Sequence, residues 1–288
     1  MKKLFQILVI GLLTVAFVGC SAKFESQQNS SGGSSTTAVE TTKGPEKAET
    51  SSAAKTVETP EAPVEMVDGP PPEGTVTVKG TVNLAGTAPP MPPLTGILGK
   101  PECATQHATT PTAEAILVDS SGGVGNCFVY VSRGVRWKYD PPTEKVVFDQ
   151  KGCIYSPRVV GVRASQPVEI TNSDPTLHNV HILQSPAMRD TNRGQPANSP
   201  SITLKFNRPH IGVNVKCDVH PWMQAYACVV EHPFFAVTNP DGSFEFPEKL
   251  PAGTYTVTVW HEYLEPVEEV VTVADGATET MALTLLAP

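Results

Sequence analysis

The sequence predicts an all-β protein held behind a disordered tether, and three observations lead to this prediction. The 288 residues include 28 prolines and 22 glycines, and this proline content is about twice the average usage of roughly 5%. From residue 76 onward, short runs alternate apolar with polar residues between Pro, Gly, Asn and Asp, which is the pattern of strands and turns. No segment shows a helical period of useful length.

Residues 1–20 have the order of an export signal. Two lysines precede an apolar stretch from Leu4 to Val18, and Gly19 and Cys20 follow it. The stretch is too short, and too close to the N-terminus, for a structural transmembrane helix. Export would place the remaining cysteines in an oxidising compartment.

The end of this signal, at 17–20, reads Phe-Val-Gly-Cys and resembles a bacterial lipoprotein signal. The resemblance implies cleavage before Cys20, which then carries the lipid, so that the protein is anchored to the membrane without spanning it. Ser21, by resemblance to Gram-negative sorting, implies the outer membrane facing the periplasm. The alternative is an ordinary secretory signal in which Cys20 is incidental.

Residues 21–75 are predicted to be the disordered tether. Ser, Thr, Glu, Ala, Pro and Lys dominate this segment, and large apolar side chains are few. Such a segment cannot bury enough apolar surface to offset the entropy lost on ordering.

Residues 76–288 are predicted to form β-sandwiches. Val76, Val78 and Val82 alternate with polar residues, and the same period recurs along the chain with turn residues between the runs. We expect antiparallel strands at these runs: 128–131, 159–162, 168–171, 179–183, 202–206, 213–215, 227–230, 243–246, 255–260, 270–273 and 281–285.

The C-terminal part carries two turn motifs. Asn-Pro-Asp-Gly at 239–242 predicts a hairpin, and Leu-Pro-Ala-Gly at 250–253 leads into the next strand. These motifs, with the strand at 78–82, resemble the transthyretin-like, carboxypeptidase-regulatory β-sandwich. The resemblance implies that 76–144 and 233–288 form one sandwich, into which 145–232 is inserted. Two tandem domains, with 76–140 belonging to the middle one, are the alternative.

The middle region holds a constellation of soft metal ligands. Its loop reads Cys217-Asp-Val-His220-Pro-Trp-Met223, and His178-Asn-Val-His181 lies upstream. A plane of two imidazoles and one thiolate with a weak axial Met is the blue-copper geometry. One loop between adjacent strands can present Cys, His and Met to a single point, while the other His arrives from a different strand.

This pattern resembles the cupredoxins, and the amicyanin group most closely. The resemblance implies a Greek-key sandwich over 145–232 that binds one type 1 copper. It makes His178 the upstream ligand, Cys217 the thiolate, His220 the second imidazole and Met223 the axial ligand. Asn179 would donate its backbone N–H to the Cys217 sulfur, which tunes the potential.

Other readings of these residues are less favoured. A zinc site wants four Cys, His or carboxylate ligands, for which Met is poor. Haem attachment needs Cys-x-x-Cys-His, and a dicopper centre needs a second Cys in the loop; neither is present. Cys217 could instead be in a disulfide, with the histidines at the surface. We expect His181 to be structural and assign no role to the remaining histidines, namely His107, His210, His232 and His261.

Four further cysteines predict two disulfides in an exported chain, with three possible connectivities. Cys103 and Cys153 both lie in loops flanked by Pro or Gly, whereas Cys127 and Cys228 enter or occupy predicted strands. Pairing like with like gives Cys103–Cys153 and Cys127–Cys228, and free buried thiols are the alternative.

These observations predict an electron-transfer protein of the cell envelope and not an enzyme. The formal net charge of -8 gives no basic excess for nucleic acid, and the lipid is the expected membrane contact. The resemblance implies a c-type cytochrome or a quinoprotein dehydrogenase as redox partner. We expect the His220 ring edge to reach solvent beside a docking patch of Pro221 and Trp222. Copper delivery without a redox partner, or a structural or carbohydrate-binding role, are the alternatives.

Overall fold

The computed structural model describes residues 65–288. The predictions for the signal at 1–20, the lipidation of Cys20 and the tether up to residue 64 therefore lie outside the described residues. Within 65–288, no helix has the length and apolar character needed to cross a membrane.

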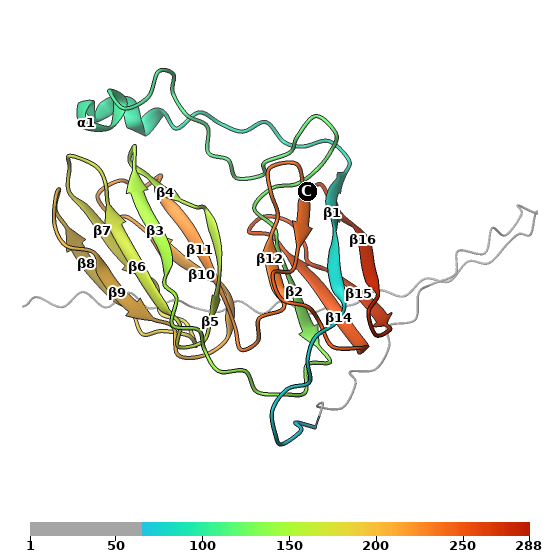
Figure 1. The fold of residues 1–288 in the computed structure, drawn as a ribbon. Helices are drawn as coiled ribbons and strands as arrows, with labels where there is room; N and C mark the ends of the chain where they lie inside the picture. The colour runs from blue at the N-terminus through green and yellow to red at the C-terminus, as the bar shows by residue number, and fades with distance from the viewer. Residues whose placement is uncertain (1–64) are drawn as a thin grey trace, which may run out of the picture. The chain divides into compact units, whose positions relative to one another are not determined.

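The prediction of an all-β fold is confirmed for this part of the chain. Strands arranged in four sheets account for the regular structure, together with one short 3-10 helix, η1 (Thr95–Gly99), and one short α-helix, α1 (Pro101–Ala104). Every run expected to be a strand overlaps one (Figure 1). Four strands were not predicted: β3 (Val146–Lys151), β4 (Ile154–Ser156), β8 (Thr191–Gln195) and β12 (Phe235–Val237).

Two of the sheets come from the middle of the chain and share one core. The first has the order β5 (Val159–Arg163), β11 (Gln224–Val230), β10 (His210–Lys216), β7 (His178–Ile182) and β8. The second has the order β4, β3, β6 (Pro167–Asn172) and β9 (Ile202–Lys205). Phe148 and Ile170 of one sheet and Val180 and Val215 of the other are buried in a single cluster. These sheets therefore pack face to face as a sandwich.

The other two sheets join strands from both ends of the described chain. One has the order β13 (Ser243–Glu245), β1 (Thr77–Ala85) and β16 (Thr278–Leu286), and the other has the order β12, β2 (Phe128–Arg133), β14 (Gly253–Trp260) and β15 (Val267–Val273). Their shared core contains Val78, Leu283, Val129 and Val257. The strands of this sandwich come from both sides of the middle region in the sequence; the expected division into domains stays a prediction.

The expectation of antiparallel pairing is wrong at three strand pairs. β1 pairs with β16, β3 with β6 and β5 with β11 in parallel. Alternation of apolar and polar residues shows which face of a strand is buried, but it does not fix the direction of the neighbouring strand. Parallel neighbours need a long crossover between them, and the separation of β1 from β16 supplies one.

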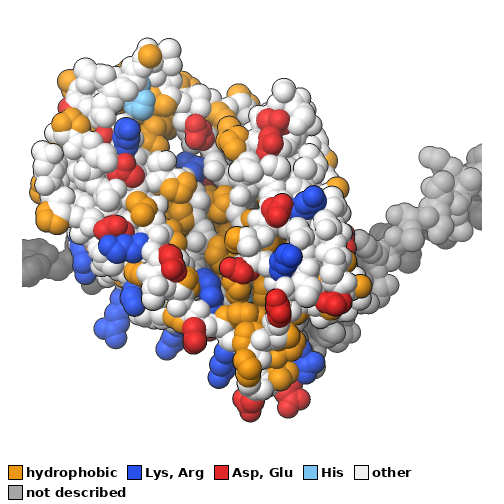
Figure 2. Space-filling view, viewed as in Figure 1, with side chains coloured by type: hydrophobic (Ala, Val, Ile, Leu, Met, Phe, Trp, Pro, Cys, Tyr) orange, Lys and Arg blue, Asp and Glu red, His pale blue; other side chains and the backbone are white. Residues whose placement is uncertain are grey.

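A small apolar cluster and an ion pair link the two sandwiches. Phe128 of β2 is buried with Val159 of β5 and Cys228 of β11. Arg158 donates to the Glu262 carboxylate, with Arg158 Nη2 2.8 Å from Glu262 Oε2. Figure 2 shows both acidic and basic side chains on the face drawn.

The long connection at 86–127, between β1 and β2, contains both short helices. Ile116 is buried in the core formed around β1 and β2, whereas Ile97 and Cys103 are buried in the core of the middle sandwich. In Figure 1, α1 lies beyond the ends of the strands of the middle sandwich. The connection therefore reaches the loops at one end of that sandwich.

Candidate metal centre

The fold brings His178, Cys217 and His220 to one place. His178 is the first residue of β7, Cys217 follows the last residue of β10, and His220 lies in the loop that joins β10 to β11. One ligand atom from each residue lies within 4.8 Å of those of the others. All three side chains are buried, and so is Met223 of the same loop, which belongs to the same core cluster.

The donor atoms point toward each other. The Nδ1 atoms of His178 and His220 are 2.9 Å apart, and the Cys217 sulfur lies 3.9 Å from the Nδ1 of His220. The loop that carries these ligands is closed by its own backbone. The Cys217 N–H donates to the carbonyl of Met223 at 3.1 Å, and the Met223 N–H donates to that of His220 at 2.8 Å.

Asn179 fastens the ligand loop to β7. Its backbone N lies 3.5 Å from the Cys217 sulfur, and its side-chain Oδ1 accepts the N–H groups of Asp218 at 2.7 Å and Val219 at 3.2 Å. The predicted contact of the Asn179 N–H with the sulfur is thus part of a larger arrangement. The amide oxygen of Asn179 orients the loop, which the sequence did not indicate.

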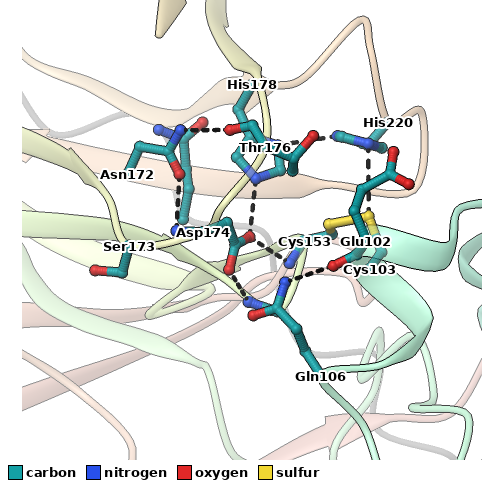
Figure 3. A network of polar contacts seen from close by, with 12 residues as sticks. Glu102, Cys103, Gln106, Cys153, Asn172, Ser173, Asp174, Thr176, His178 and His220 are labelled. Carbon is teal, nitrogen blue, oxygen red and sulfur yellow. Dashed lines mark hydrogen bonds and ion pairs between the residues drawn. A yellow bond between two sulfur atoms is a disulfide. The ribbon is translucent and has the colours of Figure 1, made fainter. Parts of the chain in front are cut away.

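Asp174 is the residue that the sequence analysis missed (Figure 3). Its buried carboxylate accepts His178 Nε2 at 2.8 Å and the backbone N–H groups of Gly152 and Cys153, each at 2.7 Å. A carboxylate that holds the second nitrogen of a ligand histidine fixes the ring and raises its basicity. An Asp four residues before a candidate ligand was the available signal.

The electrostatics of the centre favour metal binding. Burial alone would raise the Cys217 pKa, but hydrogen bonds from His178 and backbone N–H groups hold it below its usual value. Burial, followed by the neighbouring His178, lowers the pKa of His220 to about 4 and leaves that ring neutral. Burial opposes the charge on His178, yet Asp174 and Cys217 raise its pKa to about 8. Metal binding here would displace protons from the donor atoms.

The remaining histidines lie outside this cluster. His181 points to the surface, where its Nδ1 is 2.8 Å from Asp218 Oδ2. His107 Nε2 contacts the Gly152 carbonyl at 2.7 Å. The ring of His261 is buried, and burial lowers its pKa to about 4.

Of the two predicted disulfides, the structure contains one and lacks the other. Cys103 and Cys153 form a disulfide. The expected Cys127–Cys228 disulfide is wrong, because both are free buried thiols. Cys127 belongs to the core of the β1–β2 sandwich, whereas Cys228 packs in the cluster between the sandwiches. Cys127 directly precedes β2 and Cys228 lies in β11, but these positions in the sequence do not indicate which core each side chain faces.

The expectation of an exposed His220 is also wrong. His220 is 1% exposed, and its Nε2 lies 3.6 Å from the sulfur of Cys103. Trp222 is half-buried and donates its Nε1–H to the Cys153 carbonyl at 2.9 Å, while Pro221 is exposed. The segment around the disulfide covers the ring edge that was expected to face solvent.

No family model matches the sequence, and no curated protein matches it. Solved structures that resemble part of the chain include a copper-containing nitrite reductase from Thermus scotoductus (18% identity, TM-score 0.28, 36% of this chain and 25% of that one). A purple cupredoxin from Nitrosopumilus maritimus has 18% identity and a TM-score of 0.25, and the match covers 30% of this chain and 99% of that one. Amicyanin from Paracoccus versutus has 18% identity and a TM-score of 0.27, and the match covers 35% of this chain and 97% of that one. The chain spans about a quarter of the nitrite reductase. Similarities with such low identities and TM-scores do not establish a family. The proposed function therefore rests on the geometry of the centre.

The residues present fit a copper ion. A thiolate, two imidazole Nδ1 atoms and a nearby thioether form a soft donor set, and such sets select copper over hard cations. The donors are buried together, and Asp174 and Asn179 hold them by accepting hydrogen bonds from the His178 ring and from the backbone N–H of Asp218. What the structure shows is a buried His/Cys/Met cluster consistent with a copper site.

Proposed function

We propose that residues 145–232 form a cupredoxin-type domain that holds one type 1 copper ion and transfers single electrons. His178, Cys217 and His220 would bind the metal, and the Met223 thioether would be a fourth, weaker ligand. The observation that carries the proposal is the convergence of two Nδ1 atoms and one sulfur within 4.8 Å in a buried place.

The protein's contribution to electron transfer is to keep these ligands still. Copper would supply the one-electron couple. Asp174 holds the ring of His178, Asn179 holds the loop that carries Cys217 and His220, and the loop closes on itself through Met223. Ligands that are fixed in this way need little rearrangement between the two oxidation states, which favours electron transfer over substrate chemistry. This supports a protein that is not an enzyme.

The remaining parts of the proposal concern where the protein works. We infer that 76–144 and 233–288 form a transthyretin-like sandwich around the inserted domain, and that the chain is anchored at the envelope through lipidated Cys20. The partner would be a redox protein, such as a c-type cytochrome or a quinoprotein dehydrogenase. Copper delivery fits less well, because all four donors are buried and delivery requires a ligand that a partner can reach.

A copper titration of the metal-free chain tests the proposal. We expect one Cu(II) per chain and an intense visible absorption from thiolate-to-copper charge transfer. Tight binding of copper without that absorption would favour a delivery protein. No uptake of copper would overturn the metal centre and favour a structural or carbohydrate-binding role.

A further inference from the structure

The segment 94–107, called the cap below, covers the ligand loop of the proposed copper centre. It contains η1 and α1. Ile97 and Cys103 of the cap are fully buried in the cluster that also contains Cys217 and Met223. The outer side of the cap is open to solvent, with Leu98 61% exposed. The cap is therefore a thin cover over the end of the sandwich that carries the ligands.

The cap contacts the ligand loop at two points. The Cys103 sulfur lies 3.6 Å from His220 Nε2, on the side of the ring opposite to the Nδ1 that faces His178 (Figure 3). Gly96 lies flat against the Trp222 ring, because a Cβ at this position would be 2.6 Å from Cε3 of that ring. Solvent and partners therefore cannot reach His220 while the cap is in place.

The disulfide joins the cap to a well-anchored turn between β3 and β4. Gly152 and Cys153 both have positive φ, at 66° and 54°, and their N–H groups are held by the Asp174 carboxylate. The same carboxylate holds His178. The cap is thus fixed through Cys153 to the network that positions a ligand of the proposed copper.

Besides the disulfide and the contact of its sulfur with His220, apolar packing and one side-chain hydrogen bond hold the cap on the sandwich. Helix α1 has four residues, and a helix of this length has no stability of its own in water. The hydrogen bonds of Thr105 and Gln106 go back to α1 itself. Ile97 and Cys103 are buried in the core of the sandwich, and Leu94 and Ala104 pack against that core. Gly96 packs on Trp222, and His107 Nε2 contacts the Gly152 carbonyl at 2.7 Å.

We propose that the Cys103–Cys153 disulfide is a redox latch that controls access to His220, and with it the exchange of copper at the centre. The proposal rests on the copper-binding function above. To open the latch, a dithiol reductant gives two electrons and two protons to the disulfide; thiols form at Cys103 and Cys153, and the reductant becomes a disulfide. Without the covalent link the cap lifts from the loop, since a cross-link acts by limiting the open states of the chain.

Copper release from the loaded full chain tests the latch. The variant Cys103→Ser/Cys153→Ser imitates the open latch without a thiol reductant, which would itself bind copper. With ascorbate and a cuprous chelator in excess, we expect release from this variant to be about tenfold faster or more, because release through local opening follows the population of the open state. Release as slow as from the wild type, with an unchanged visible spectrum, would overturn the latch.

Two further variants separate the latch from a general loss of stability. Cys127→Ser removes a buried thiol from the other core and should leave the release rate unchanged. Gly96→Val keeps the disulfide but pushes the cap off Trp222, and it should release copper at an intermediate rate. If Gly96→Val and the double variant both behaved as the wild type, the cap would not control access.

A readout without metal distinguishes failure of the latch from failure of the copper centre. Residue-resolved histidine labelling by diethyl pyrocarbonate, followed by mass spectrometry, should modify His220 several-fold faster in the double serine variant than in the wild type. Half-buried His210, which lies outside both the cap and the centre, provides the internal reference. If the wild type binds no copper, the proposed function fails, but the labelling still tests the latch. Equal labelling of His220 in the wild type and the double serine variant would overturn the latch.

Discussion

Both sandwiches consist of two packed sheets, but the pKa values of their buried cysteines are shifted in opposite directions. In the sandwich built around β1 and β2, Cys127 is surrounded by apolar side chains, and burial raises its pKa to about 12. In the middle sandwich, Cys217 is also buried, yet its pKa lies below the usual value because His178 and backbone N–H groups hydrogen-bond to the sulfur. Burial alone disfavours the thiolate, whereas hydrogen-bond donors to a buried sulfur favour it, and the thiolate is the form that binds metals.

Removing each thiol in turn tests this difference between Cys217 and Cys127 and has the largest expected effect. Cys217→Ser should abolish the visible absorption of the copper-loaded chain, because the charge transfer originates at the sulfur. Cys127→Ser should leave both the absorption and the one-to-one stoichiometry unchanged, since that sulfur lies in another core. Retention of the absorption in Cys217→Ser would show that another thiol binds the metal.

Removing the carboxylate behind His178 should weaken the centre without destroying it. Asp174→Asn loses the negative charge that accepts three N–H groups, and we expect copper affinity to fall about 10- to 100-fold, as for other partners of ligand histidines. Competition with a chelator of known affinity measures this change.

The matched control for that variant is Asp190→Asn. Asp190 is exposed and pairs with His181, which lies outside the cluster, so its substitution should leave copper affinity unchanged. Equal losses of affinity in the two variants would mean that Asp174 has no particular role in holding His178.

Loss of the ion pair between the two sandwiches should lower the free energy of unfolding more than loss of an exposed ion pair. Arg158→Met leaves the carboxylate of Glu262, whose side chain is 1% exposed, without its partner, and we expect a loss of about 3 kcal/mol in the free energy of unfolding. Arg133→Met breaks an exposed pair with Glu268 and should cost less than about 1 kcal/mol. Urea unfolding of both variants tests this difference, and equal losses would contradict the buried character of the joint.

A dependence of stability on pH, smaller than the effect expected for Arg158→Met, should come from His261. Burial lowers its folded pKa to about 4, so the unfolded chain takes up a proton first as the pH falls. The stability that His261 contributes is therefore present above about pH 6.5 and is lost as the pH falls from there to about 4, with a limit on the order of 2–3 kcal/mol. Urea unfolding of the wild type and of His261→Asn at pH 7 and pH 5 measures the contribution of His261 to the pH dependence of the free energy of unfolding. An identical pH dependence in both would show that His261 does not titrate this way.

The sequence predicted those parts of the fold that depend on local alternation and on short spacings. The alternating runs gave most strands, and the Cys217-to-Met223 spacing picked out residues that the structure gathers around His178. Strand β8 was missed because its exposed middle residues, Asn192, Arg193 and Gly194, carry no apolar alternation.

The parts that could not be predicted depend on contacts between distant segments. The cap at 94–107 has no strand or helix pattern of useful length, so nothing local placed it on His220. The role of Asp174 depends on the backbone of Gly152 and Cys153, more than twenty positions away in the chain. For the same reason, the number of cysteines could suggest disulfides but could not show that Cys127 and Cys228 face different cores.

The most direct test of the copper centre is anomalous diffraction at the copper edge from crystals of the loaded chain. We expect one strong peak bounded by the Nδ1 atoms of His178 and His220 and the sulfur of Cys217, with the Met223 sulfur close to it. A peak at surface histidines such as His181, or no peak within bonding distance of the Cys217 sulfur, would contradict it.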